Sequence, residues 1–156
     1  MNDDDVLGKL FELGLQLPSP PQALAAYVPC VVQGGVASVA GQVPMLGGKP
    51  TVSGRLGDGV TAEEGAAGAR QAALQSLAVL RHALGGFERL ERLVQVTVFV
   101  AATPDFVEHP KVANGASELF LSVLGEAGRH ARVAVGVASL PLGAAVEVAV
   151  TAAVRY

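Results

Sequence analysis

The C-terminal stretch of residues 130–156, HARVAVGVASLPLGAAVEVAVTAAVRY, is the most informative part of this chain for its fold class. Two valine-rich runs alternate in period two on either side of Ser-Leu-Pro-Leu-Gly, a pattern typical of two β-strands with a turn between them. Each run carries one charge, Arg132 in the first and Glu147 in the second. A lone charge in a strand that is at least half buried is costly unless it is paired or binds a ligand. These two residues are therefore the first candidates for chemistry.

The spacing of the two runs predicts how Arg132 and Glu147 lie. If the strands form a hairpin centred on residues 140–141, Glu147 is opposite Ala134 and Arg132 is opposite Ala149. Residues i and i+2 share a sheet face, so this register places both charges on one face as diagonal neighbours. A shift of one residue would move them to opposite faces. We therefore expect the two side chains to be close together.

The upstream sequence predicts a β-hairpin, two long helices and one more long strand. Gly34-Gly35 separates two β-rich runs, and residues 61–64 form a capping box at the start of a helix. Gly85-Gly86 ends that helix. The expected elements are a short helix that begins at residues 3–5, strands at 27–33, 36–40, about 49–53 and 93–101, and helices at 61–84 and 111–124.

This order of elements indicates an α+β fold in which two main helices pack on one face of a mixed β-sheet, with a short N-terminal helix added. The Pro-Ser-Pro-Pro segment at residues 18–21 separates that helix from the rest. We therefore divide the chain into an N-terminal helix and linker, residues 1–24, and an α+β domain, residues 25–156.

The composition predicts an oligomer. The chain is 51% hydrophobic and 16% charged, whereas soluble domains carry about 25% charged residues. Prolines and glycines interrupt every apolar stretch before it reaches the roughly 18 residues of a membrane-spanning helix. The surplus apolar surface is therefore expected to be covered by further copies of the chain.

Charge and motif content exclude several classes of protein. A net charge of −3 without a basic cluster argues against nucleic-acid binding, which depends on Lys and Arg. The acidic start, Asp3-Asp4-Asp5, is unlike a secretory signal, and a lone Cys30 forms no internal disulfide. A cytoplasmic protein is expected. Three histidines and Cys30 lack metal-ligand spacing, and no dinucleotide motif is present, so we expect no metal and no cofactor.

The residue types at positions 132 and 147 suit one kind of reaction. A guanidinium presents a rigid fork of donors that matches a carboxylate. A nearby carboxylate can position or deprotonate a water molecule. Together they would form a pocket in which water attacks a small substrate that bears a carboxylate. The alternative is that Arg132 and Glu147 only pair with each other.

The same stretch resembles a known family. Residues 131–148, read as A-R-x-x-V-x-V-x-x-L-P-x-x-x-x-V-E-V, are similar to the C-terminal signature of the RidA/YjgF family, enamine/imine deaminases once labelled L-PSP endoribonucleases. Further matching motifs are Gly-Gln-Val-Pro at 41–44, the alternating strand at 94–100, and Asp-Phe at 105–106 before a helix with Asn114. The segment 128–136 and the extra N-terminal helix are similar to a longer-chain branch of that family.

The resemblance implies a chorismate-mutase-like fold that assembles as a homotrimer with a cleft between each pair of subunits. It implies hydrolysis of reactive enamines and imines, such as 2-aminoacrylate, to 2-keto acids and ammonia without a cofactor. By position, Arg132 matches the arginine that binds the substrate carboxylate, and Glu147 matches the acid that helps to place the water. The further substrate-binding candidates are Tyr27, Gly41, Asn114, Ala134 and His130, the last of which lies two residues before Arg132 on the same expected strand face.

Three positions depart from the family pattern. Ala134 stands where typical deaminases have cysteine, Ala40 where they have serine, and Gly136 where they often have a second acid. The pocket would therefore be less polar. Two other functions stay open: a non-catalytic module that binds a 2-keto acid or another small carboxylate, and the endoribonuclease activity after which relatives were once named.

Overall fold

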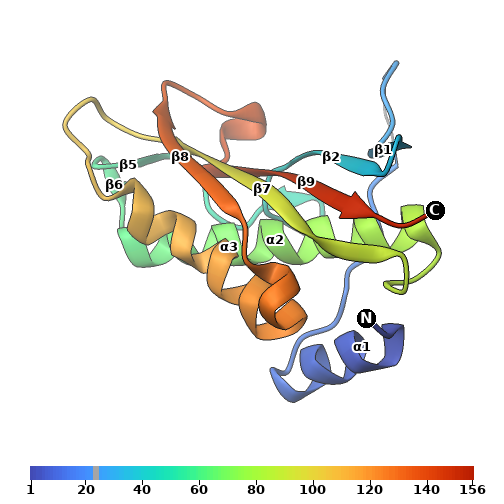
Figure 1. Cartoon of the computed structure of the whole chain (residues 1–156). Coiled ribbons are helices and arrows are strands. Elements are labelled where there is room, and N and C mark those ends of the chain that lie inside the picture. Colours follow the sequence, from blue (N-terminus) through green and yellow to red (C-terminus); the bar gives the residue numbers. More distant parts are fainter. Residues whose placement is uncertain (23–24) are drawn as a thin grey trace.

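The computed structural model describes residues 1–22 and 25–156. Its centre is a five-stranded sheet with the strand order β1-β2-β9-β7-β8 (Figure 1). The sheet is mixed, because β8 pairs parallel with β7 while the other neighbours are antiparallel. Its strands are β1 (Cys30–Gln33), β2 (Val36–Gln42), β7 (Leu90–Ala101), β8 (Ala131–Val137) and β9 (Val146–Val154).

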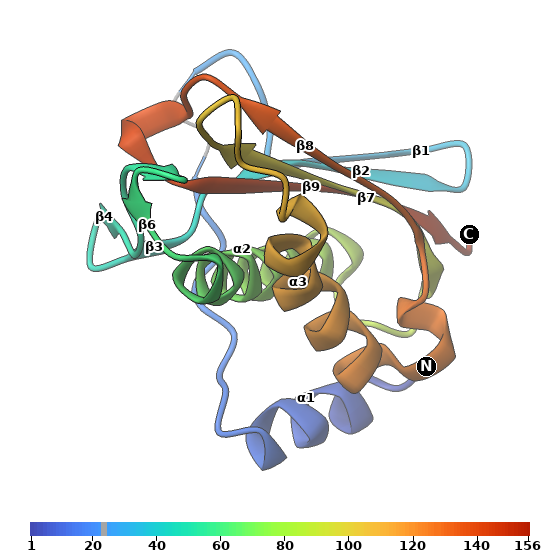
Figure 2. The same ribbon diagram turned by 90° about the vertical axis from the view of Figure 1, so that its left-hand side faces the viewer.

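The helices lie on one side of this sheet. Helices α2 (Ala62–Leu84) and α3 (His109–Leu124) cover one face, and no helix of the described chain covers the other (Figure 1). Helix α1 (Asp3–Glu12) lies beyond α3, farther from the sheet (Figure 2). This arrangement confirms the predicted α+β fold with two main helices on one face of a mixed sheet. The shorter elements are β3 (Met45–Leu46), β4 (Lys49–Pro50), β5 (Arg55–Leu56), β6 (Gly59–Val60), and the 3₁₀ turns η1 (Gly125–Gly128) and η2 (Pro141–Gly143).

The two C-terminal strands do not form the predicted hairpin, although both strands exist. Strand β7 lies between them and pairs with β8 on one edge and β9 on the other. The connection is too long for a tight turn and passes over the end of β7, where Ala101 N–H donates to the Ala145 carbonyl and Ala102 N–H donates to the Val137 carbonyl. The predicted pairing of Arg132 with Ala149 and of Glu147 with Ala134 is therefore wrong.

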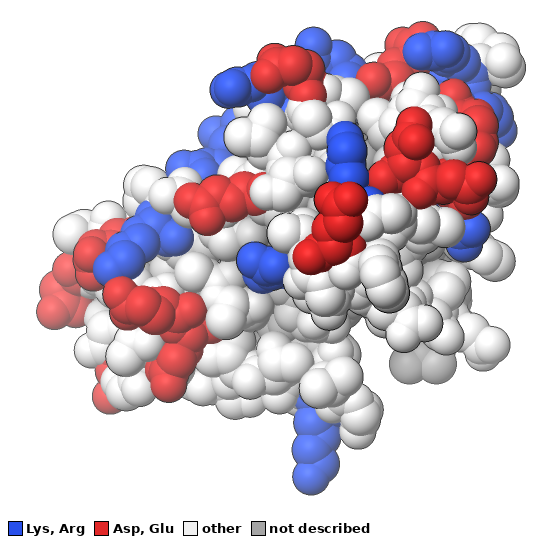
Figure 3. Space-filling model, turned by 90° about the horizontal axis from the view of Figure 1, so that it is seen from below, with Lys and Arg blue, Asp and Glu red and all other residues white. Residues whose placement is uncertain are grey.

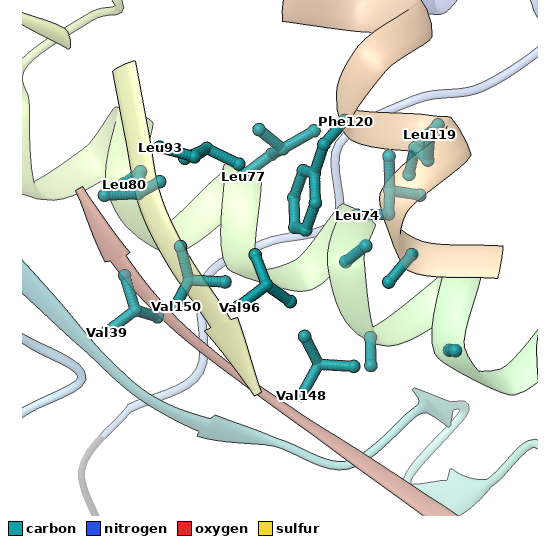
Figure 4. Close-up of a cluster of buried hydrophobic side chains, with 14 of the residues drawn as sticks. Val39, Leu74, Leu77, Leu80, Leu93, Val96, Leu119, Phe120, Val148 and Val150 are labelled. Carbon is teal, nitrogen blue, oxygen red and sulfur yellow. The ribbon is translucent and has the colours of Figure 1, made fainter. Parts of the chain in front are cut away.

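The core lies between the sheet and the helices. Strand β9 alternates strictly, with every second residue buried toward the helices. Its valines meet leucines of α2 and Phe120 of α3 (Figure 4). Each such side chain contributes roughly 1.5–3 kcal/mol through burial. The opposite side chains of the sheet point to the uncovered face.

Helix ends follow the local sequence. Thr61 and Glu64 form the predicted capping box of α2, with the Thr61 hydroxyl accepting from the Glu64 amide. Gly85 ends the helix in the left-handed region, at φ 76°, where glycine has no steric penalty. Helices α2 and α3 pack very closely at Gly115, because a methyl group there would overlap the backbone carbonyl of Ala66.

Helix α1 belongs to the same packed unit as the sheet domain. Val6 and Leu10 are buried in the common core. The Asp3 carboxylate accepts hydrogen bonds from the Arg81 guanidinium, from Nε at 2.9 Å to one oxygen and 3.1 Å to the other and from Nη2 at 2.7 Å. The boundary predicted after residue 24 falls at residues 23 and 24, which lie outside the described residues. Within the described ranges, no helix has both the length and the apolar character that crossing a membrane requires.

Candidate functional site

Arg132 lies on the helix-covered face of the sheet, at the edge strand β8. Its register partner is Val96 of β7, which is buried against the helices. The side chain reaches helix α3, where Nη1 donates to Asn114 Oδ1 at 2.8 Å and to Ser117 Oγ at 3.2 Å. Two neutral oxygens therefore orient the guanidinium.

The charge of Arg132 is not neutralised by the described part of the chain. No carboxylate there lies within 4.0 Å of the guanidinium, although five other ion pairs are formed. The side chain is exposed and borders a cavity of about 220 Å³ together with Ser117, Leu121, Gly128 and His130. An exposed guanidinium with unused donors beside a cavity is suited to bind a carboxylate.

His130 supports Arg132 through Ser117. His130 Nδ1 lies 2.6 Å from the Gly128 carbonyl oxygen, so this nitrogen carries the proton. In the neutral ring Nε2 then accepts from the Ser117 hydroxyl at 2.9 Å. Burial, followed by the positive charge of Arg132, holds the pKa of His130 below its ordinary value. The imidazole is therefore neutral at pH 7 and leaves a Ser117 lone pair for Arg132.

Glu147 lies on the other, uncovered face. It sits in β9 between Val146 and Val148, which point to the core, and its register partner in β7 is Phe99. Its carboxylate lies over Gly41, where any Cβ would overlap Oε1. Gly41 belongs to the irregular part of β2 where the register with β9 shifts. A glycine is therefore required at position 41 for Glu147 to adopt this position.

The environment of Glu147 favours its neutral form. The side chain is partly buried, and burial raises the pKa of its carboxyl above the ordinary value. Within residues 1–22 and 25–156 it accepts no hydrogen bond and forms no ion pair. A carboxyl group in such surroundings keeps its proton to a higher pH than an exposed one, which suits a group that accepts and returns a proton.

Arg132 and Glu147 are therefore not neighbours, and the predicted proximity is wrong. Their strands are separated by β7, and their register positions differ by three residues along it. With strand spacings of ~4.8 Å and ~3.3 Å per residue, their Cα atoms are about 14 Å apart, and their side chains point to opposite faces. The alternative, a structural Arg132–Glu147 ion pair within one chain, is wrong for the same reason.

The predicted site residues other than Tyr27 fall into two groups. The arginine half-site, on the helix-covered side of β8, contains Arg132, Asn114, His130 and Ala134. The glutamate half-site, on the uncovered face, contains Glu147 and Gly41. Tyr27 is exposed and belongs to neither group by any described contact; it lies two residues before Pro29, whose carbonyl accepts from Ala40 N–H next to Gly41.

The sequence interpretation missed Ser117. It lies three residues after Asn114 on α3, so both side chains share one helix face. That spacing was the available signal. In the part of the chain that the structure describes, no group of three or more His, Cys, Asp or Glu side chains is arranged to hold a metal ion.

The chain is similar to several known proteins. Residues 8–154 match the model of a family described as YjgF/chorismate mutase-like, with endoribonuclease as its provisional activity. Protein TCP17 of Trypanosoma cruzi is 47% identical over 144 residues, which cover 92% of this chain and 90% of that protein. The crystal structure of Atu1372 from Agrobacterium tumefaciens is 41% identical with a TM-score of 0.92, covering 99% of this chain and 96% of that one. A Shewanella oneidensis structure, provisionally described as an endoribonuclease, is 34% identical with a TM-score of 0.90 and covers 95% and 98%.

Proposed function

Because the chain belongs to the YjgF/chorismate mutase-like family, we propose that it deaminates reactive enamines and imines of the 2-aminoacrylate type by hydrolysis. The products are 2-keto acids and ammonia. The reaction takes place in clefts between the subunits of a homotrimer, as expected from the sequence resemblance to the RidA/YjgF proteins.

The observation that carries this proposal is the state of Arg132. Its guanidinium is fixed by Asn114 and Ser117, is exposed, and has no carboxylate partner in the described residues. A 2-imino acid carries a carboxylate next to the reacting carbon. Bidentate binding of that carboxylate would hold the imine carbon at a fixed distance from β8 and replace the missing counter-ion.

The uncovered sheet face supports the cleft. It presents Val31, Val36, Val133 and Val135, each at least 40% exposed, and Val135 shares the register of Glu147 through Phe99 of β7. A second copy packed on this face would bury these valines. Such packing can bring the arginine half-site of one subunit to the glutamate half-site of the next, which one chain alone cannot do.

The proposed chemistry needs only water and one proton carrier. The enamine takes a proton from solvent on its methylene carbon and becomes an iminium ion. The water oxygen then bonds to C2 while Glu147 accepts a water proton, which gives a carbinolamine. Glu147 returns this proton to the nitrogen, the C–N bond breaks, and ammonia leaves. The remaining hydroxyl proton is released as the keto group forms.

The raised pKa of Glu147 suits this role, since the group must both accept and return a proton within one turnover. The cause of the shift is burial, which a second subunit on the uncovered face would increase. Gly41 contributes by leaving space for the carboxylate above its Cα.

The test measures keto-acid release when an amino acid oxidase generates imines in the presence of the purified protein. We expect acceleration by the wild type and none by Arg132→Gln. Arg70→Gln removes the same charge from an exposed position of α2 and should retain the acceleration. Equal rates with Arg132→Gln and wild type would contradict the proposal, as would no acceleration over a panel of amino acids.

A second candidate function is supported by Ala134 and Ala40, where polar side chains are expected in deaminases of this type. The same cleft would then bind a 2-keto acid without chemistry. Calorimetric binding of 2-oxobutyrate, lost in Arg132→Gln and unaccompanied by turnover of any imine, would select this function.

Endoribonuclease activity has less support. Acidic and basic side chains alternate over the helix-bearing surface, without a continuous basic area on that view (Figure 3). The net charge of −3 also opposes binding of a polyanion. RNA cleavage by highly purified protein that persists in Arg132→Gln would favour it.

A further inference from the structure

Gly136 lies on the same face of β8 as Arg132 and Ala134, four residues beyond the arginine. It has no Cβ, and the imidazole of His109 occupies the space beside it. A Cβ at Gly136 would lie 2.8 Å from His109 Nε2, closer than side chains tolerate. The ring of His109 also packs edge-on against Phe106, with ring centroids 5.2 Å apart. The absent side chain at position 136 therefore leaves room for an imidazole at this end of β8.

A cavity of about 370 Å³ surrounds this glycine and is here called the Gly136 cavity. Arg55 and His109 line it, together with small and apolar residues. No carboxylate of the described chain is among its lining residues. Arg55 has one partner, Asp58, at 3.4 Å, and both side chains are largely exposed. Exposed pairs of this kind are weak, so Arg55 can exchange Asp58 for a ligand carboxylate.

The Gly136 cavity and Arg132 are arranged along one line. Helix α3 runs beside β8, with His109 near Gly136 and Asn114 near Arg132. His109 and Asn114 are five positions apart on α3, which is about 7.5 Å along the axis, and Gly136 and Arg132 are four positions apart on β8, which is about 13 Å along the strand. Ala134 lies between them on the strand and projects only a methyl group. Because the Arg132 guanidinium reaches back to Asn114, an extended ligand with two acidic groups can contact both ends.

We propose that the Gly136 cavity binds the second carboxylate of a dicarboxylic substrate whose first carboxylate is bound by Arg132. The substrate class would be imino or keto acids of glutarate length. His109 and Arg55 would donate hydrogen bonds to the distal carboxylate. This inference rests on the proposed function, since it assumes that Arg132 is the anchor of the substrate.

The test compares two ligands by isothermal titration calorimetry on the full-length protein. 2-Oxoglutarate has the distal carboxylate, and 2-oxobutyrate lacks it. We expect wild type to bind 2-oxoglutarate about tenfold more tightly, a difference typical of charge-assisted hydrogen bonds at a partly exposed site. His109→Ala and Arg55→Gln should each reduce 2-oxoglutarate affinity about fivefold and leave 2-oxobutyrate affinity within a factor of two.

Gly136→Ala tests the same inference without removing a charge. The new methyl group displaces the tip of the His109 side chain, which is flexible, so the fold should be retained. The preference for 2-oxoglutarate should fall to about the level of His109→Ala. Arg70→Gln, remote on α2, is the matched control for general electrostatics and should keep the full preference.

The outcomes separate the two proposals. Equal affinity of the wild type for both ligands, with binding lost in Arg132→Gln, would overturn the dicarboxylate inference and leave the proposed function intact. Binding of both ligands that persists in Arg132→Gln would overturn the anchoring role of Arg132 and with it both proposals. A preference that His109→Ala, Arg55→Gln and Gly136→Ala leave unchanged would also overturn the inference.

Discussion

Arg132 and Glu147 lie on opposite faces of one sheet, with β7 between the strands that carry them. Arg132 faces α3, whereas Glu147 faces the uncovered side above Gly41. A small substrate cannot contact both side chains of one chain. If both act in the proposed reaction, every site must combine Arg132 of one subunit with Glu147 of another.

This separation predicts intersubunit complementation. Arg132→Gln and Glu147→Gln should each be inactive in the oxidase-coupled assay. When the two are unfolded together in equal amounts and refolded, about a quarter of the sites should contain an intact Arg132 and an intact Glu147, because each site draws its two halves at random from different subunits. Activity should return to about a quarter of the wild-type rate.

Mixing without unfolding provides the control, since homotrimers of the proposed kind that do not exchange subunits should stay inactive. A double variant with both substitutions in one chain should give no activity under either condition. If co-refolded single variants also stay inactive while native mass spectrometry shows oligomers that contain both variants, the shared site is wrong.

Local patterns predicted most of the elements correctly. The Gly34-Gly35 turn and the capping box at Thr61 depend on a few adjacent residues, and both are present as expected. The pairing of β8 and β9 failed because it depends on a distant segment. Each of these strands pairs with one edge of the long, apolar β7, and the two do not pair with each other. The alternating pattern of a strand does not specify its partner.

The site shows the same limit. Motif positions identified Arg132, Asn114 and His130 as site residues. The Arg132 guanidinium donates to Asn114 and Ser117, and the His130 ring accepts from Ser117. The relation of Arg132 to Glu147 could not be found by counting residues, because it depends on which strand lies between them. The position of His109 could likewise not be predicted from the sequence, since its place beside Gly136 follows from the direction in which α3 passes β8.

Glu147 should reduce stability at neutral pH. Burial raises the pKa of its carboxyl, so the folded state favours the protonated form. The cost of ionisation is absent below the unfolded pKa of about 4.3 and grows as pH rises through the raised folded pKa. We expect Glu147→Gln to melt at a slightly higher temperature than wild type at pH 8, with the difference vanishing near pH 4. Glu118→Gln, on the exposed side of α3, should show no such trend in calorimetry.

Asp3 should have the opposite pH dependence. Its hydrogen bonds with Arg81 hold the pKa of its carboxyl below the ordinary value. The stabilisation of α1 is therefore complete above the unfolded pKa of about 3.9 and is lost as pH falls through the lowered folded pKa. We expect Asp3→Asn to speed amide exchange in α1 several-fold at pH 7, measured by mass spectrometry. Asp5→Asn removes the same charge from the first turn but, among the described contacts, breaks no hydrogen bond, so equal effects of both variants would contradict this role.

Gly115 should be the most sensitive helical glycine. Helices α2 and α3 touch there through the backbone, and an added methyl group would overlap the Ala66 carbonyl, which cannot rotate away. We expect Gly115→Ala to lower the free energy of unfolding by about 2 kcal/mol, as overpacking in a dense core does. Gly8→Ala is the matched control, because nothing lies within 4 Å of its added methyl group. It should gain about 0.5–1 kcal/mol from helix propensity. Urea unfolding at one fixed protein concentration measures both, and a Gly115→Ala variant as stable as Gly8→Ala would show that the two helices can separate without cost.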